Sequence, residues 1–229
     1  MTDTANYTIA VFAGDGIGPE VTNPTIELLN AVSKLTGGFT LTFDHLEAGA
    51  ELYVREGKSF EDSAMERAAA ADAILLGAMG LPEVRYEDGT EISPQLDLRE
   101  KFELYAGQRP VMSFRGLPSP LVDKRAKDIN FVLVRESTEG LFSSRKEPSN
   151  GGEEARDELL ITRRISEKLF DHAFRLARHR KAQGFPGRVT CVDKANVLGS
   201  FAFFREIFFE RAKRFPDIKA DCTLSLIHI

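Results

Sequence analysis

Short apolar runs, each closed by glycine or polar residues, alternate along the chain with longer stretches of helical period. The apolar runs predict strands at 7–13, 39–45, 73–76, 128–135, 159–163 and 189–192. The helical pattern covers 21–35, 59–71, 95–105, 165–181 (with Ser166 as its cap) and 200–215. Strands that alternate with helices indicate an α/β fold with parallel or mixed sheets. The proline-rich stretch 110–120 reads as an irregular passage between two lobes.

The apolar run 131–134 ends in Arg135, so a fixed cation leaves the core at the end of a strand. A guanidinium keeps its charge, and its planar fork binds a carboxylate at two points. Arg99 and Arg109 lie upstream in similar settings and, with Arg135, predict a pocket for a small polyanionic acid. The alternative is that all three are surface charges. For Arg135, at the mouth of an apolar run, we favour the pocket.

A glycine-rich turn, GDGIGPE at 14–20, joins the first predicted strand to the first helix. A strand, glycine turn and helix can present free backbone N–H groups to an anion. The spacing is G-x-G-x-G and departs from the G-x-G-x-x-G dinucleotide pattern, so a tight turn with positive φ explains it equally well. Gly77 and Ala78 follow the strand 73–76, at the carboxyl edge where open α/β sheets bind ligands.

Composition narrows the class of protein. The 229 residues are 42% hydrophobic and 28% charged, which suits one large domain or two modest ones. The net charge of -5 gives no electrostatic case for nucleic acid or an anionic membrane, and no apolar segment is long enough to span a bilayer. Cys191 and Cys222 lack metal-ligand spacing, and the N-terminus lacks a signal-peptide pattern. We therefore expect a cytoplasmic protein.

Four motifs occur in a fixed order: GDGIGPE at 14–20, LREKFELYAGQRP at 98–110, VRESTEG at 134–140 and VDKANV at 192–197. Together they resemble the isocitrate and isopropylmalate dehydrogenase family, metal-dependent oxidative decarboxylases of 3-substituted malates that include tartrate and D-malate dehydrogenases. The resemblance covers residues 7–222. It implies the two-lobed, isopropylmalate dehydrogenase-like α/β fold, which is not a Rossmann fold and so explains the altered glycine pattern.

The resemblance also assigns roles to single residues. It implies that Arg99, Arg109 and Arg135 clamp the substrate's carboxylates, and that Lys194 accepts the proton of the substrate hydroxyl across the interface of a homodimer. Asn196 matches an asparagine beside the nicotinamide, and Gly77 and Ala78 are further cofactor candidates. The substituent on the substrate is selected by Ser93, Gln95 and Leu96. The polar Ser93 and Gln95 favour a carboxylate, hydroxyl or hydrogen substituent over an isopropyl group.

The activity implied by the resemblance is NAD-dependent oxidative decarboxylation of a small di- or tricarboxylic 2-hydroxy acid, with NADP not excluded. The resemblance also implies magnesium or manganese as a cofactor, which as a Lewis acid would stabilise an enolate. The alternative is a non-catalytic regulatory or binding subunit of the same fold. A phosphate-loop kinase or NTPase is excluded because the chain has no G-x-x-x-x-G-K-[ST].

The sequence departs from the family in two ways. The family's relay tyrosine, seven residues after the third arginine, is Phe142, which cannot donate a proton. The family's metal-binding aspartates and adenosine-binding loop would lie beyond the last residue, because Asp217 and Asp221 match only the lead-in to them. We therefore assign no metal ligand and expect a C-terminally truncated chain that is poorly stable and inactive alone.

The predicted domains are a cofactor-side segment at 1–109 and a substrate and dimerisation domain at 110–223 with an exposed arm at 143–163. The last six residues, 224–229, match nothing in the family. We expect them to be a non-native tail, in which His228 has no functional meaning.

Overall fold

The computed structural model describes residues 4–114, 116–145, 149–150 and 152–225. The chain forms two compact units, Met1–Phe102 and Glu103–Ile229. The division between the two units falls after residue 102, whereas the sequence predicts a boundary after residue 109. The assignment of the units to cofactor and substrate remains a prediction.

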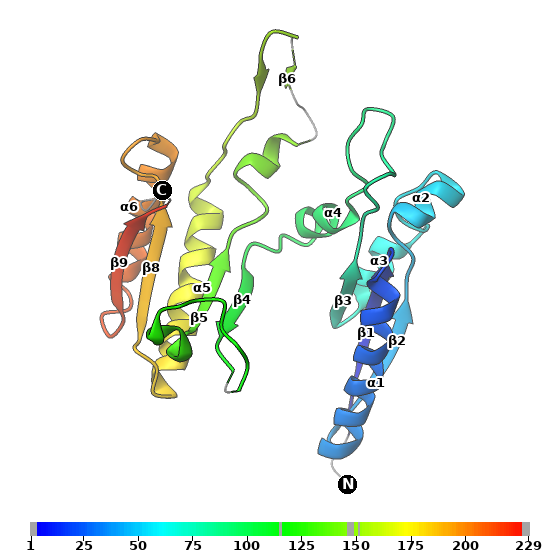
Figure 1. Cartoon of the computed structure of the whole chain (residues 1–229), viewed down its shortest axis with the longest axis horizontal. Coiled ribbons are helices and arrows are strands. Elements are labelled where there is room, and N and C mark those ends of the chain that lie inside the picture. The colour runs from blue at the N-terminus through cyan, green and yellow to red at the C-terminus, as the bar shows by residue number, and fades with distance from the viewer. Residues whose placement is uncertain (1–3, 115, 146–148, 151, 226–229) are drawn as a thin grey trace. The chain divides into compact units, whose positions relative to one another are not determined.

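The first unit is a parallel three-stranded sheet in the order β2-β1-β3 with helices around it (Figure 1). Its elements are β1 (Ala5–Gly14), α1 (Gly18–Thr36), β2 (Phe39–His45), α2 (Ala50–Glu56), α3 (Ala64–Ala70), β3 (Ala73–Ala78) and α4 (Pro94–Lys101). The core of this unit centres on Ala10 and Phe12 of β1, both fully buried. The middle strand β1 therefore packs inward, and the glycine turn follows its carboxyl end.

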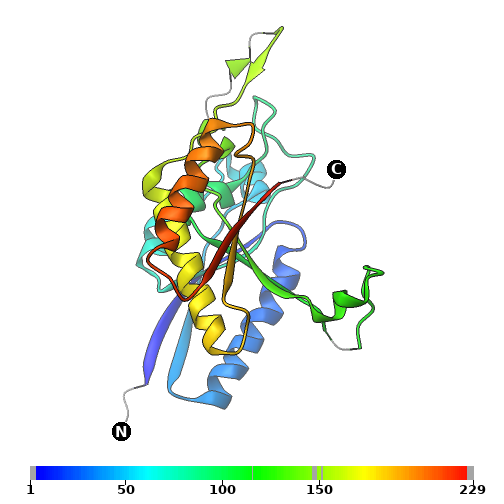
Figure 2. The same ribbon diagram turned by 90° about the vertical axis from the view of Figure 1, so that its left-hand side faces the viewer.

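Among the described residues, the second unit contains three two-stranded sheets and two long helices. Its elements are β4 (Gly107–Met112), η1 (Lys124–Asp128), β5 (Asn130–Arg135), η2 (Leu141–Ser144), β6 (Ser149–Asn150), β7 (Ala155–Arg156), α5 (Arg163–Ala182), β8 (Arg188–Asp193), α6 (Gly199–Ala212) and β9 (Lys219–Leu224). β4 pairs with β5 in antiparallel fashion, and β8 pairs with β9 in parallel. Figure 2 shows β8 and β9 beside the paired helices α5 and α6, with the β6–β7 hairpin projecting from the unit.

Phenylalanine rings hold α5, α6 and β8 together. Phe174 of α5 is fully buried and stacks on Phe208 and Phe215, with ring centroids 5.3 and 5.1 Å apart. The aromatic load of α6 thus faces largely inward, although Phe209 remains 39% exposed. Burying rings of this size contributes much of the stability of a small unit.

Several predicted elements differ from the observed ones. The strand β4 occupies 107–112 and so overlaps the start of the irregular passage predicted at 110–120. Pro110 is tolerated because β4 is an edge strand paired only with β5. Residues 159–163 form no strand and contribute one bridge, Leu160 to Gly140. The cap of α5 is Thr162, whose hydroxyl accepts from the Ile165 N–H, and not Ser166, which lies inside the helix. The predicted helices at 59–71 and 95–105 are shorter, and α2 and β9 were not predicted.

Within the predicted arm at 143–163, the described residues include the two-residue strands β6 and β7. Residues 226–229 of the predicted non-native tail, including His228, lie outside the described residues. None of the helices in the described part of the chain has the length and apolarity that a membrane span requires.

Candidate functional site

The hairpin of β4 and β5 brings two of the predicted arginines onto one face. In the antiparallel register Arg109 lies opposite Leu133, and Arg135 lies two residues further along the same strand. Residues opposite one another, and residues two apart on one strand, point to the same side. Arg109 and Arg135 are therefore diagonal neighbours, and residues in such a pair lie about 7–8 Å apart. Both are exposed, so this face presents two adjacent cations.

These two cations differ from most arginines of the chain in having no carboxylate partner among the described residues. Ion pairs to carboxylates occupy Arg55, Arg67, Arg85, Arg125, Arg156, Arg163, Arg164, Arg178, Arg188, Arg205, Arg211 and Arg214. In an acidic protein, two unneutralised guanidinium groups on one face form a natural receptor for a small dianion.

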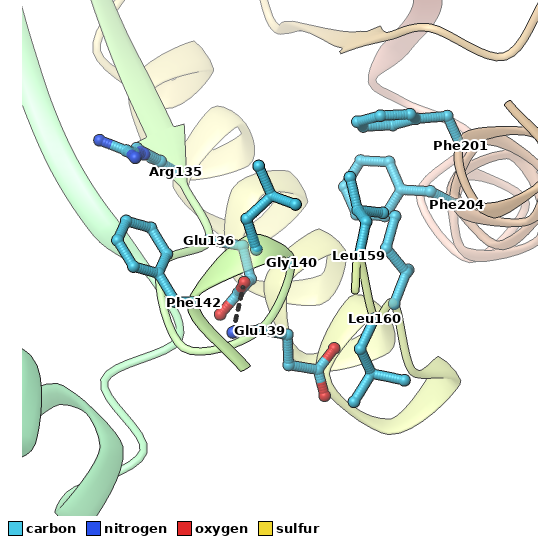
Figure 3. Close-up of a pocket in the computed structure, with 11 residues that line it drawn as sticks. Arg135, Glu136, Glu139, Gly140, Phe142, Leu159, Leu160, Phe201 and Phe204 are labelled. Carbon is cyan, nitrogen blue, oxygen red and sulfur yellow. Dashed lines mark hydrogen bonds between the residues drawn. The ribbon is translucent and has the colours of Figure 1, made fainter. Parts of the chain in front are cut away.

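A cavity of about 450 Å³ opens beside Arg135 (Figure 3). Its walls are mostly apolar and come from the loop after β5, from residues 159–161 and from α6: Leu141, Phe142, Leu159, Leu160, Ile161, Phe201 and Phe204. The Arg135 guanidinium carbon lies over the Phe142 ring, 5.6 Å from its centroid. The cation–π contact orients the guanidinium without neutralising it.

Two glutamates also line this cavity, but their carboxylates are engaged by the chain itself. Glu136 accepts hydrogen bonds from the backbone N–H groups of Thr138 and Glu139, at 2.6 and 3.0 Å. Glu139 accepts from the N–H of Thr162 at 2.8 Å and from its hydroxyl. These carboxylates shape the loop that carries Phe142, and Arg135 supplies the free charge.

The third predicted arginine belongs to the first unit. Arg99 is half-buried on α4, four residues after Gln95 and three after Leu96, so the three share one helix face. Ser93 is the residue before the helix, and its hydroxyl donates to the Glu91 carbonyl. The Gln95 Oε1 atom is buried without a hydrogen-bond partner in the described structure. The convergence of this face with the Arg109–Arg135 pair remains a prediction.

The glycine turn after β1 holds an anion that belongs to the protein itself. Asp15 is only 3% exposed, and its carboxylate accepts from the backbone N–H groups of Ala50, Glu51 and Gly80 at 2.7–2.8 Å. Gly14 has φ of 78°, and a Cβ there would lie 1.9 Å from the Ala78 carbonyl oxygen. The tight-turn interpretation of the motif is therefore the one that the contacts support, with Asp15 filling the place of an external anion.

Gly77 and Ala78 are tied to the same turn. A Cβ on Gly77 would lie 2.2 Å from the Ala13 carbonyl oxygen, and the Ala78 carbonyl accepts from the Asp15 N–H at 2.7 Å. The chain's own packing thus requires glycine at 77. A cofactor contact at these residues remains a prediction.

Lys194 and Asn196 lie in the turn between β8 and α6. The half-buried Lys194 donates through Nζ to the Ser225 carbonyl at 2.6 Å, and Asn196 is exposed. Asp193, 1% exposed, is held by Arg205 and by the Ala195 N–H. Burial alone would raise the pKa of the Asp193 carboxyl. The hydrogen bonds from Arg205 and the Ala195 N–H outweigh burial, so the pKa lies below its usual range.

Sequence reasoning missed Asp15 and Arg205. An aspartate between two glycines is a visible signal for the first, whereas Arg205 meets Asp193 from twelve residues away across a turn. Among the described residues, no group of three or more His, Cys, Asp or Glu side chains is arranged to hold a metal ion.

Comparison with known proteins gives one consistent result. The sequence pattern described as isocitrate/isopropylmalate dehydrogenase matches residues 8–224. A 3-isopropylmalate/3-methylmalate dehydrogenase of Methanocaldococcus jannaschii is 38% identical, over 94% of this chain and 59% of the relative. A 3-isopropylmalate dehydrogenase of Geobacillus kaustophilus is also 38% identical, over 93% of this chain and 58% of the relative.

Among solved structures, an isocitrate dehydrogenase from Methylococcus capsulatus superposes with a TM-score of 0.79 at 30% identity, covering 95% of this chain and 60% of that one. The chain therefore spans about three fifths of the length of these relatives. The matches confirm the α/β fold class predicted from the four motifs.

Proposed function

Because the chain belongs to the isocitrate and isopropylmalate dehydrogenase family, we propose that the protein acts in the NAD-dependent oxidative decarboxylation of a malate-type 2-hydroxy acid. The substrate class is that of isopropylmalate, isocitrate, tartrate and D-malate, and NADP is the alternative cofactor. The active form is a homodimer.

One observation supports this proposal above the others. Arg109 and Arg135 lie on one face of the β4–β5 hairpin, and neither has a carboxylate partner among the described residues. Two like charges side by side repel one another unless an anion bridges them. A substrate with two carboxylates relieves that repulsion and is held in one orientation by two planar donors.

In the proposed reaction Arg109, Arg135 and Arg99 bind the carboxylates and fix the substrate before any bond changes. Lys194 of the other subunit takes the proton of the substrate hydroxyl while the nicotinamide cofactor, near Asn196, Gly77 and Ala78, accepts the hydride. No step is assigned to a metal ion, because the described residues offer no cluster that fits one. Magnesium or manganese stays part of the proposal as the metal cofactor that membership of the family implies.

The residues around the predicted substituent also bear on the substrate. Gln95 Oε1 is a buried acceptor without a partner among the described residues, and such an atom gains most from a donor on the ligand. A hydroxyl substituent supplies that donor, whereas an isopropyl group does not. Phe142 lacks a hydroxyl, so the proton that completes the reaction does not come from this side chain.

The first test measures dianion binding to the 229-residue chain by calorimetry, with tartrate and D-malate as probes. Arg109→Met and Arg135→Met should each weaken binding about tenfold or more, because each removes a charge-assisted hydrogen-bond donor. Arg175→Met is the matched control, since Arg175 is exposed on α5 and also lacks a carboxylate partner in the described structure. If all three variants bound tartrate and D-malate with the same affinity, the proposed site would be rejected.

The second test separates an enzyme from a non-catalytic regulatory subunit of the same fold. Both should bind the dianion, but only an enzyme reduces the cofactor. The gene product at its full encoded length is assayed with D-malate, tartrate, isopropylmalate and isocitrate, with magnesium or manganese and NAD or NADP. Dianion binding without cofactor reduction by any of the four acids would favour the regulatory subunit.

A further inference from the structure

The turn that carries Lys194 also contains an ion pair between Asp193 and Arg205. We propose that Arg205 is a positioning residue: it captures the Asp193 carboxylate and so leaves the Lys194 amine without an acidic partner. This inference deepens the proposed function and rests on it for the role of Lys194 as the proton acceptor.

Both carboxylate oxygens of Asp193 accept hydrogen bonds from within the chain. Arg205 donates to both carboxylate oxygens, from Nε at 2.9 Å and from Nη2 at 2.6 Å. The Ala195 N–H donates to Oδ1 at 2.8 Å, and the Cys191 thiol lies 3.5 Å from Oδ2. The Asp193 side chain is fully buried, and Arg205 is 28% exposed. A buried carboxylate with this set of donors has no free face to offer another cation.

The consequence appears at the next residue. Lys194 follows a buried aspartate directly, yet its half-buried side chain forms no salt bridge within the described residues. The Lys194 carbonyl accepts from the N–H groups of Val197 and Leu198, at 3.0 and 3.1 Å. The backbone of the turn is thus held by hydrogen bonds next to Lys194, while the Lys194 amine has no carboxylate partner among the described residues.

Arg205 is suited to this role by its place in the fold. It lies in the second turn of α6, which starts at Gly199, and reaches back to the end of β8. The bidentate fork needs guanidinium geometry, so a lysine at 205 would retain the charge but only part of the bonding.

The test measures the amine itself and needs no turnover. The folded 229-residue chain is treated with trace acetic anhydride, and labelling of Lys194 is quantified by mass spectrometry against Lys34, an exposed lysine of α1. In Arg205→Met the freed carboxylate should draw in the Lys194 ammonium and slow its labelling about threefold, the size of a modest ion pair. Arg205→Lys should restore the rate in part, because lysine keeps the charge but not the bidentate fork. The double variant Arg205→Met with Asp193→Asn should restore the wild-type rate.

A purely structural brace gives a different pattern, because loosening the turn speeds labelling in both Arg205→Met and Asp193→Asn. Labelling of Lys194 in folded Arg205→Met at the wild-type rate or faster would overturn the proposal. If Arg205→Met does not fold, Arg205→Gln decides by the same criterion, since it keeps a donor and removes the charge. Arg211→Met is the matched control, because Arg211 holds Asp171 in a similar bidentate pair on the same helix. A failure of dianion binding would reject the proposed function and leave this readout intact.

Discussion

At the scale of single residues, the two cysteines illustrate how environment sets reactivity. The β8–β9 register pairs Cys191 with Cys222, but Cys191 is buried in the aromatic core and Cys222 is exposed. Burial raises the pKa of the Cys191 thiol far above its usual range, and the neighbouring Asp193 carboxylate raises that pKa further. A raised thiol pKa leaves almost no thiolate, which is the reactive form, at neutral pH.

We therefore expect iodoacetamide to alkylate Cys222 at least about tenfold faster than Cys191 in the folded chain, because Cys191 is both protonated and shielded. Peptide mass spectrometry over a time course measures the two rates separately. In denaturant the rates should converge, which provides the control. Similar rates in the native chain would mean that β9 opens readily and exposes Cys191.

Single residues also mark the limit of sequence reasoning about the site. Arg135 was identifiable because an arginine directly after four apolar residues must emerge at a strand end. The pairing of Asp193 with Arg205 was not, because neither residue carries a local signal for the other and a helix turn decides the contact. In the sequence, an arginine that binds a ligand cannot be distinguished from one that pairs with a carboxylate of the same chain.

At the scale of elements, Asp15 joins three segments of the first unit. Its buried carboxylate connects the β1–α1 turn to the start of α2 and to Gly80 after β3. Asp15→Asn removes the charge and turns one acceptor oxygen into a donor facing N–H groups. We expect it to lower the free energy of unfolding of this unit by about 2–3 kcal/mol.

Urea denaturation measures that loss, with Asp88→Asn as the control. Asp88 likewise accepts from a backbone N–H, that of Thr90, but in an exposed turn, so its substitution should cost less than about 0.5 kcal/mol. Equal effects of the two substitutions would show that the β1–α1 turn is held by its glycines rather than by the Asp15 carboxylate.

The elements found from sequence were those with strong periodicity. The strands β1, β2, β5 and β8 and the helices α1, α5 and α6 combine apolar runs or apolar faces with sufficient length. The strand β4 was not predicted, because all six of its residues are exposed and one is proline, so the sequence shows no apolar face there. α2 escaped because seven residues give too few periods, and it depends on Asp15 to hold its first N–H groups.

At the scale of the whole molecule, each of the two units has its own hydrophobic core. The first centres on Ala10 and Phe12, and the second on the stacked rings of Phe174, Phe208 and Phe215. A unit that buries its own core is able to unfold by itself, and its amides then exchange independently of the other unit. Two substitutions, Asp15→Asn in the first unit and Phe174→Ala in the second, test this independence.

We expect Phe174→Ala, which removes a fully buried ring at a cost of about 3–5 kcal/mol, to accelerate hydrogen exchange in peptides of Glu103–Ile229 only. Asp15→Asn should accelerate exchange in peptides of Met1–Phe102 only. Exchange mass spectrometry on the two variants and the wild type reads both units at once, so each variant is the control for the other. If either substitution accelerated exchange throughout the chain, the two units would be one cooperative body.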